Sequence, residues 1–243
     1  MQIVYRRTVT SVAEKRKLLP STTLWLFVVA YFGLTVTRSV GWFPESWSLM
    51  PVVENAWLNF LVVLAAILWM RIQKIPLSCV GLGAFQPSRT LIMWVVGAMA
   101  IDSVVVGIAF LVLTSAFGEA PTVARFADLP GNLPLLLMLL PATWLFAAFG
   151  EEFFFRGFLM TAIAEVLGGS RAAWISAVVF QAAAFGLIHA YQGPVQVISI
   201  GIGGAVYGGV FVLARRNLWP LIFAHGLNDT LGFILLYSGV IQL

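Results

Sequence analysis

The chain of 243 residues is 60% hydrophobic and only 10% charged, whereas soluble globular proteins carry about 25% charged residues. So few charges cannot cover the surface of a water-soluble domain, and the composition therefore excludes a soluble domain, a disordered chain and a nucleic-acid-binding module. In lipid the backbone must satisfy its own hydrogen bonds, and bundled helices are the usual solution. We predict an all-α, polytopic transmembrane helix bundle with seven to eight membrane-spanning helices, in one integral-membrane domain, 1–243.

The net charge of +4 is distributed as in proteins that are oriented by the membrane, not as in proteins that bind polyanions. The single cysteine, Cys79, permits no internal disulfide and cannot form a cysteine zinc site alone. In a seven-span topology the basic groups fall on one side of the membrane, so we predict a cytoplasmic N-terminus. These groups are Arg6, Arg7, Lys15, Arg16 and Lys17 near the N-terminus, and Arg71, Lys74, Arg171, Arg215 and Arg216 further along.

The hydrocarbon core of a membrane requires about 20 apolar residues per helical crossing. Trp42 and Trp47, which follow the first apolar run, are typical of an aromatic belt at the interface. The run 133–168 would be about 54 Å long as a single α-helix, so we expect it to tilt, to kink near Pro141 or Gly150, or to split into two spans. In chain order the apolar runs are 24–40, 56–70, 90–117, 133–168, 172–190, 195–214 and 218–237.

Ionisable side chains inside these runs are functional candidates by default, because they are costly in lipid. Asp102 has no cation near it in the sequence, which leaves both an interhelical hydrogen bond and a site role open. Glu165 lies near a glycine turn and can extend to the interface. The full set is Asp102, Glu151, Glu152, Arg156, Glu165, His189, His225 and Asp229, and it includes both histidines of the chain.

The first motif is Glu-Glu-Phe-Phe-Phe-Arg at residues 151–156. On a helix, Glu152 and Arg156 share a face in the favourable acid-first order and can neutralise each other. Glu151 lies about 100° around the helix, so it is left without an adjacent cation. Such a carboxylate can serve as a general base. An ionic clamp between helices is the alternative interpretation.

The second motif is Phe-Gly-Leu-Ile-His at residues 185–189. A single histidine inside a membrane often serves only as a hydrogen-bonded packing residue. However, the turn at 168–171 lies about 19 residues from both Glu151 and His189. If the two arms are antiparallel helices with a rise of about 1.5 Å per residue, these side chains come level with each other. We therefore expect an acid and an imidazole to meet in one site.

The third motif is His-Gly-Leu-Asn-Asp at residues 225–229. His225 and Asp229 share a helix face, and a carboxylate beside an imidazole fixes its tautomer and orientation. An interhelical hydrogen-bonded pair is the alternative. Together the motifs predict a water-containing cavity within the membrane, suited to hydrolysis. The spacing of the residues does not require a Ser-His or an Asp-Asp catalytic pair. The His-Glu-x-x-His zinc motif is absent from the sequence.

In this order, the three motifs resemble those of the CAAX-protease and bacteriocin-processing family (CPBP, also called Abi) of intramembrane proteases. That family carries Glu-Glu-x-x-x-Arg, then Phe-x-x-x-His, then His-x-x-x-Asn/Asp on successive helices. The resemblance spans 150–231, roughly a third of the chain. It divides the domain into N-terminal helices, 20–132, and a catalytic core, 133–243. The compact length without a soluble extension indicates a prokaryotic member in the cell membrane.

The resemblance implies an endopeptidase in which Glu151 activates water and His189 assists. His225 and Asp229 would then stabilise the oxyanion. Several members have Asn at the position of Asp229, and an ionised Asp would repel an oxyanion. Asp229 is therefore protonated, or it orients His225, or its neighbour donates instead. The residues expected in supporting roles are Glu152, Arg156, Asn228 and Phe185.

Both a metal-dependent and a metal-free glutamate mechanism have been proposed within this family. We favour the metal-free mechanism, in which no cofactor is required. If Zn²⁺ is present, its expected ligands are Glu151, His189 and His225. The expected partners are the lipid bilayer and a membrane-associated protein or peptide substrate, with no nucleic acid. The substrate classes of the family are CAAX-type prenyl proteins, bacteriocins and C-terminal sorting signals.

Three other functions are compatible with parts of the pattern. A non-catalytic membrane immunity or scaffold protein of the same family would keep the motifs without turnover. A haem protein could use His189 and His225 as axial ligands, although this leaves the Glu-Glu-x-x-x-Arg motif unexplained. A proton-coupled transporter would also use intramembrane acids and histidines.

Overall fold

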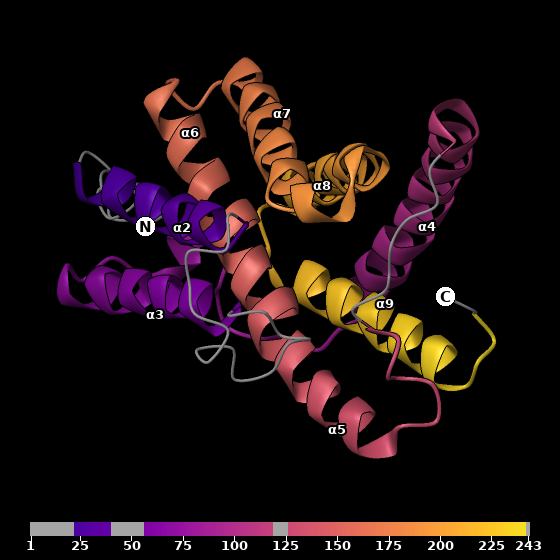
Figure 1. Cartoon of the computed structure of the whole chain (residues 1–243). Coiled ribbons are helices and arrows are strands. Elements are labelled where there is room, and N and C mark those ends of the chain that lie inside the picture. The colour runs from indigo at the N-terminus through magenta and orange to yellow at the C-terminus, as the bar shows by residue number, and fades with distance from the viewer. Residues whose placement is uncertain (1–21, 40–55, 119–125, 242–243) are drawn as a thin grey trace, which may run out of the picture.

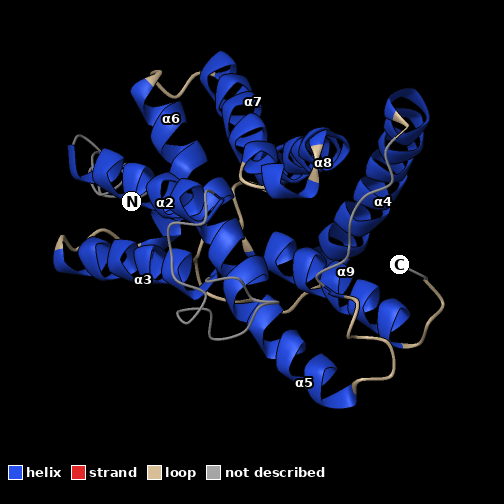
Figure 2. Ribbon diagram, in the orientation of Figure 1, coloured by secondary structure: helices blue, strands red, loops and turns tan. Residues whose placement is uncertain are grey.

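A computed structural model describes residues 22–39, 56–118 and 126–241, and within these ranges the chain is helical with no strand (Figure 2). The predicted all-α class is therefore confirmed. The basic N-terminal residues, Trp42 and Trp47 lie outside the described residues. The longer helices are α2 (Thr22–Ser39), α3 (Ala56–Ile72), α4 (Arg89–Phe117), α5 (Leu133–Ala142), η4 (Thr143–Leu159), α6 (Met160–Val166), α7 (Arg171–Leu187), α8 (Pro194–Leu213) and α9 (Trp219–Tyr237), with short 3₁₀ turns η2 (Leu77–Val80) and η5 (Ala190–Gln192).

The helices follow the predicted apolar runs to within a few residues at each end. Three of the described helices are long and apolar enough to cross a membrane: Arg89–Phe117, Leu133–Val166 and Pro194–Leu213. Large apolar side chains are exposed on the outside of the bundle, as on Met93 and Leu111 of α4. Such a surface is suited to lipid and not to water. The chain is an integral membrane protein.

The fourth run forms one continuous helix, so no eighth span arises among the described residues. α5, η4 and α6 join end to end from Leu133 to Val166, and the middle part is a π-helix. The π-helical part begins two residues after Pro141, which has no N–H to donate to the carbonyl group four residues earlier. Neither Pro141 nor Gly150 breaks the helix. π-helical turns are rare and frequently occur at functional sites.

This long helix runs through the middle of the bundle (Figure 1). α2 and α3 lie on one side of it, while α9 and α4 lie on the other. α7 lies beside α6, and α8 packs between α7 and α4. The phenylalanines of the first motif anchor it, because Phe153, Phe154 and Phe155 are all fully buried. The ring of Phe154 stacks on Tyr31 of α2, with centroids 3.8 Å apart. The charged ends of the motif are thus fixed by aromatic packing between them.

Close packing also joins α7 to α8. A Cβ on Gly208 would lie 2.7 Å from Nε2 of Gln181, and a Cβ on Gly204 would lie 3.2 Å from the Cα of Ala182. Nε2 of Gln181 donates to the carbonyl oxygen of Gly204 at 2.7 Å. The small residues of α8 therefore allow the two helices to pack closely.

Gly157 provides a test of packing at the central helix. A Cβ there would lie 2.6 Å from the carbonyl oxygen of Val80 and 2.8 Å from Cδ1 of Leu218. We expect Gly157→Ala to lower the free energy of unfolding by about 2 kcal/mol, because the backbone of η2 must move away. Thermal unfolding in detergent measures this. Gly107→Ala on α4 is the matched control, because its Cβ meets nothing within 4 Å; equal stability of the two variants would contradict the packing.

Candidate active site

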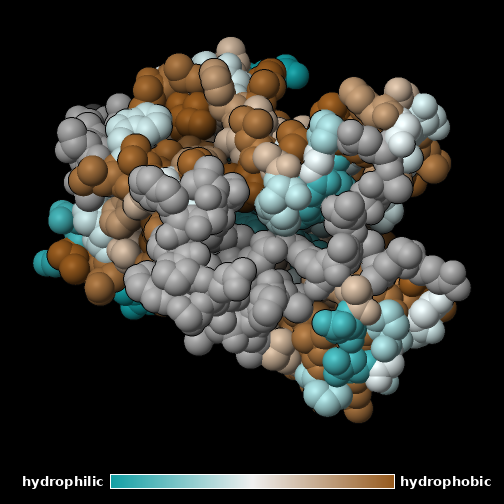
Figure 3. Space-filling view, in the orientation of Figure 1, coloured by the Kyte–Doolittle hydropathy of each residue, from teal (hydrophilic) through white to brown (hydrophobic). Residues whose placement is uncertain are grey.

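A cavity of about 480 Å³ lies between the central helix and the helices around it. All eight residues that the sequence predicts for the site line this cavity: Phe185, Glu151, Glu152, Arg156, His189, His225, Asn228 and Asp229. Hydrophilic residues gather around the hollow of the face shown in Figure 3, whereas much of the rest of the described surface is hydrophobic. The fold therefore brings the three motifs, which are far apart in sequence, to one polar space.

Glu152 is the central group of this cluster. Its side chain is completely buried, and Oε1 accepts hydrogen bonds from Nη1 of Arg156 at 2.9 Å and from Nδ1 of His225 at 2.8 Å. The pair with Arg156 is the one expected from the spacing. The contact with His225 is not expected from the sequence, because it joins helices that are 73 positions apart.

Aromatic rings hold the buried guanidinium group from its other sides. Cζ of Arg156 lies 4.2 Å from the ring centroid of Phe185 and 5.5 Å from that of Tyr207. A cation over an aromatic face is attracted by the ring quadrupole, and more strongly when water is excluded. Phe185 of the second motif thus supports Arg156 of the first, which gives its supporting position a physical basis.

The imidazole of His225 lies between two carboxylates. Nδ1 faces Glu152, and Nε2 lies 3.5 Å from Oδ2 of Asp229. The shorter contact is that of Glu152, and a carboxylate hydrogen-bonded to Nδ1 fixes the tautomer and the ring orientation. Asp229 is itself held by Thr143, whose hydroxyl group donates to Oδ2 at 2.8 Å. Orientation of the ring, which the spacing assigns to Asp229, thus comes mainly from Glu152.

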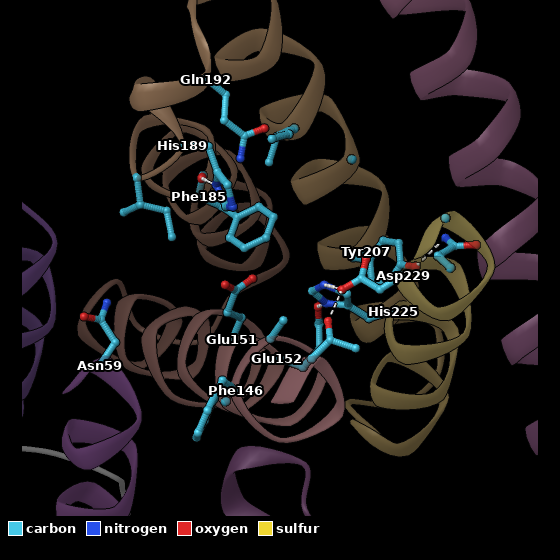
Figure 4. A pocket seen from close by; sticks show the side chains of 18 of the residues that line it. Asn59, Phe146, Glu151, Glu152, Phe185, His189, Gln192, Tyr207, His225 and Asp229 are labelled. Carbon is cyan, nitrogen blue, oxygen red and sulfur yellow. Dashed lines mark hydrogen bonds and ion pairs between the residues drawn. The ribbon is translucent and has the colours of Figure 1, made fainter. Parts of the chain in front are cut away.

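Asn228 is directed toward Tyr207 of α8. Its Nδ2 donates to the Tyr207 hydroxyl oxygen at 3.2 Å. Figure 4 shows Tyr207 beside His225 and Asp229, on the side of the cavity away from Glu151. Asn228 therefore links α9 to α8.

Glu151 differs from Glu152 in exposure and in hydrogen bonding. It is partly exposed to the cavity, and it forms no hydrogen bond or ion pair with any side chain in the part of the chain that the structure describes. Figure 4 shows its carboxylate between His189 on one side and His225 on the other. This is the position in which a base could contact a bound water molecule and a substrate carbonyl group together.

His189 lies just beyond the end of α7, not within the helix as the apolar run predicts. α7 ends at Leu187, and the chain turns there through a hydrogen bond from the His189 amide to the Gly186 carbonyl oxygen. Nδ1 of His189 contacts the Phe185 carbonyl oxygen at 2.8 Å. Because a carbonyl oxygen only accepts hydrogen bonds, Nδ1 carries the proton. In a ring that carries a single proton, Nε2 is then the basic nitrogen.

The expected zinc ligands do not form a metal-binding group in this arrangement. Among the described residues, no three His, Cys, Asp or Glu side chains are grouped so that they could hold an ion. Glu151, His189 and His225 line one cavity, and Nδ1 of His225 is hydrogen-bonded to Glu152. We therefore derive no step through a metal ion.

Other polar residues also line the cavity without a catalytic role predicted from the sequence, and three of them lie at or near the motifs. Thr143 precedes the first motif by eight positions and is the polar residue of an otherwise apolar stretch, which is a weak signal. Tyr207 stands among the glycines of α8 and is buried. Asp102 reaches the cavity from α4, which favours a place at the site over a purely structural hydrogen bond.

Comparison with known proteins identifies one family. The family described as type II CAAX prenyl endopeptidase Rce1-like matches residues 133–231. No curated protein and no solved structure matches the chain. All three motifs lie within the matched residues, and the match confirms the family resemblance that they indicate. At the level of the family, it also supports a membrane-embedded endopeptidase.

The adjacent acids Glu151 and Glu152 provide a test of the site. We expect Glu152→Gln to lower the free energy of unfolding by about 3 kcal/mol, because Arg156 then keeps a buried charge without a counter-ion. The matched change Glu151→Gln removes no observed contact and should alter stability by less than about 1 kcal/mol. Unfolding of both variants in the same detergent measures the difference. Equal effects would show that the shared contact does not stabilise the protein.

Proposed function

We propose that the chain is an intramembrane endopeptidase that hydrolyses a peptide bond of a membrane-associated protein or peptide with water activated by Glu151. One observation carries this proposal: of two adjacent acids, Glu152 is buried and hydrogen-bonded, while Glu151 faces the cavity between two histidines without a partner among the described residues. A carboxylate used only for packing would be paired as Glu152 is.

In the proposed reaction, Glu151 takes a proton from water, and the oxygen of that water attacks the carbonyl carbon of the scissile bond. A tetrahedral intermediate with a negative oxygen forms. When the carbon–nitrogen bond breaks, Glu151 returns the proton to the leaving amine. His189 assists as a hydrogen-bond partner of the water, through the ring nitrogen that is not bound to the Phe185 carbonyl oxygen. Atoms and protons balance without a cofactor.

His225 is the proposed electrophilic partner of the oxyanion. Glu152 fixes the ring at Nδ1, so that Nε2 is directed toward the cavity wall formed by Asp229. Asp229 accepts a hydrogen bond from the Thr143 hydroxyl group. This bond disperses the negative charge of Asp229 away from the oxyanion. Preorganised donors of this kind commonly contribute about 10²–10³-fold to the rate.

The proposed substrate is a protein or peptide that reaches the cavity from the membrane. CAAX-type prenyl proteins, bacteriocins and C-terminal sorting signals all meet this description. We further propose a prokaryotic cell membrane, a cytoplasmic N-terminus and a catalytic core that comprises 133–243. The match over residues 133–231 supports the position of this core.

A non-catalytic immunity or scaffold protein is the main alternative. Its motifs would serve packing alone, and Glu151 could then be replaced without consequence. A bis-histidine haem protein predicts a Soret absorption band in the purified protein. A proton-coupled transporter predicts pH-driven flux into liposomes. These observations separate the alternatives without knowledge of the substrate.

Replacement of Glu151 tests the catalytic assignment. We expect Glu151→Gln to reduce cleavage by about 10²–10⁴-fold, the usual contribution of a general base. Terminal-peptide mass spectrometry of host membranes that carry the wild type or the variant measures this and identifies the substrate, because the substrate keeps an uncut terminus in the variant. If a folded variant leaves every terminus unchanged, the scaffold or transporter function replaces the protease.

Metal removal tests the cofactor assignment. We expect the purified protein to keep its cleavage rate after treatment with a strong zinc chelator, because each proposed step uses only side chains and water. A zinc metalloprotease treated in parallel shows that the chelator is effective. Loss of cleavage that added Zn²⁺ restores would contradict the metal-free mechanism while leaving the protease assignment intact.

A further inference from the structure

The cavity has more negative than positive groups, which bears on the substrate. Among the described residues that line it, one side chain, Arg156, carries a permanent positive charge, and it is bonded to Glu152. His225 lies between Glu152 and Asp229. Two of the four carboxylates, Asp102 and Glu151, therefore have no cationic partner in the described part of the chain. Glu151 is used by the proposed reaction, whereas Asp102 is not.

Asp102 has a defined position on the wall formed by α4 and α8. It is the only charged residue between Arg89 and Glu119 in the sequence, so α4 carries one ionic group inside an apolar span. A Cβ on Gly203 of α8 would lie 3.0 Å from Oδ1 of Asp102 and 3.3 Å from Cγ2 of Val106. The absence of a side chain at Gly203 thus makes room for the carboxylate at the cavity.

A second hydrogen-bond acceptor, Ser199, lies on α8. Ser199 is one turn before Gly203 on α8, lines the cavity, and is 1% exposed. Its Oγ has no hydrogen-bond partner within the described ranges of the chain. A buried hydroxyl group without a partner is costly and points to a ligand or water that satisfies it. Asp102 places a negative charge at the cavity, and the buried Ser199 hydroxyl group lies in the same wall.

From these positions we propose that Asp102 and Ser199 form a binding site for a cationic side chain of the substrate. The protease would then select peptides with Lys or Arg near the scissile bond. An ammonium or guanidinium group has several N–H donors and no acceptor, which suits a wall that offers a carboxylate and an unpaired hydroxyl oxygen. This inference rests on the proposed protease function and specifies its substrate class as basic, membrane-associated segments.

Binding to an inactive protein tests the selectivity without turnover. The Glu151→Gln variant, reconstituted in neutral lipid vesicles, is titrated with fluorescent apolar peptides that carry one Lys, scanned over three positions on each side of the central bond. Matched peptides carry Gln at the same positions. We expect one position at which Lys binds at least about tenfold more tightly than Gln, as for a partly desolvated charge pair. In Glu151→Gln/Asp102→Asn this ratio should fall to about one.

Gly203 and Gly209 provide the matched steric pair. Gly203→Ala places a methyl group against Asp102 and should reduce the Lys-to-Gln ratio by about threefold or more, because the carboxylate must move. Gly209→Ala on the same helix meets nothing within 4 Å and should leave the ratio unchanged. A general disturbance of α8 would affect both variants alike.

The outcomes separate this inference from the proposed function. A Lys preference that disappears with Asp102→Asn and weakens with Gly203→Ala supports the cation site. Equal binding of Lys and Gln peptides at every position, or a preference that survives Asp102→Asn, overturns it. In the active protein the same peptides give the ratio of kcat/KM. Cleavage of Lys and Gln peptides at equal rates overturns the cation site but keeps the protease; Lys-selective binding without any cleavage keeps the site and rejects the protease.

Discussion

The shared carboxylate oxygen of Glu152 is the contact on which the rest of the site depends. It accepts hydrogen bonds from Arg156 on its own helix and from His225 on α9. Phe185 then supports Arg156 from α7. All three motifs therefore contribute to a single connected cluster. Because a buried carboxylate or guanidinium group without a partner is strongly unfavourable, these contacts favour the packing of the three helices in this arrangement.

The same cluster explains how two adjacent glutamates can have different functions. Glu152 is enclosed by the aromatic packing of the central helix, and its Oε1 accepts hydrogen bonds from two donors. Glu151 is one position earlier, and the turn of the helix directs it into the cavity. We therefore expect loss of the Glu152 charge to lower stability, and loss of the Glu151 charge to change mainly the chemistry of the cavity. Chemistry and stability are thus divided between neighbours.

Much of this was accessible from the sequence. The long apolar runs predicted the helices because length and hydropathy are local properties, and the ionisable groups within them marked the cavity because charge in lipid is costly. The contact between Glu152 and His225, the support of Asp229 by Thr143 and the approach of Asp102 to Gly203 were not accessible. They depend on how separate helices rotate and cross, which no local pattern determines. The sequence also predicts His189 inside a helix, because the apolar run continues past the point where α7 ends.

The position of Arg156 four residues after Glu152 has a consequence for how the protein is made. Both charges belong to one helix, so this helix brings its own counter-ion into the lipid. A nascent chain can therefore insert the central helix before α9 and His225 have been synthesised. A counter-ion on α9 alone would leave an unpaired charge in the bilayer throughout that interval. The intrahelical pair thus separates the order of membrane insertion from the order in which the active site is assembled.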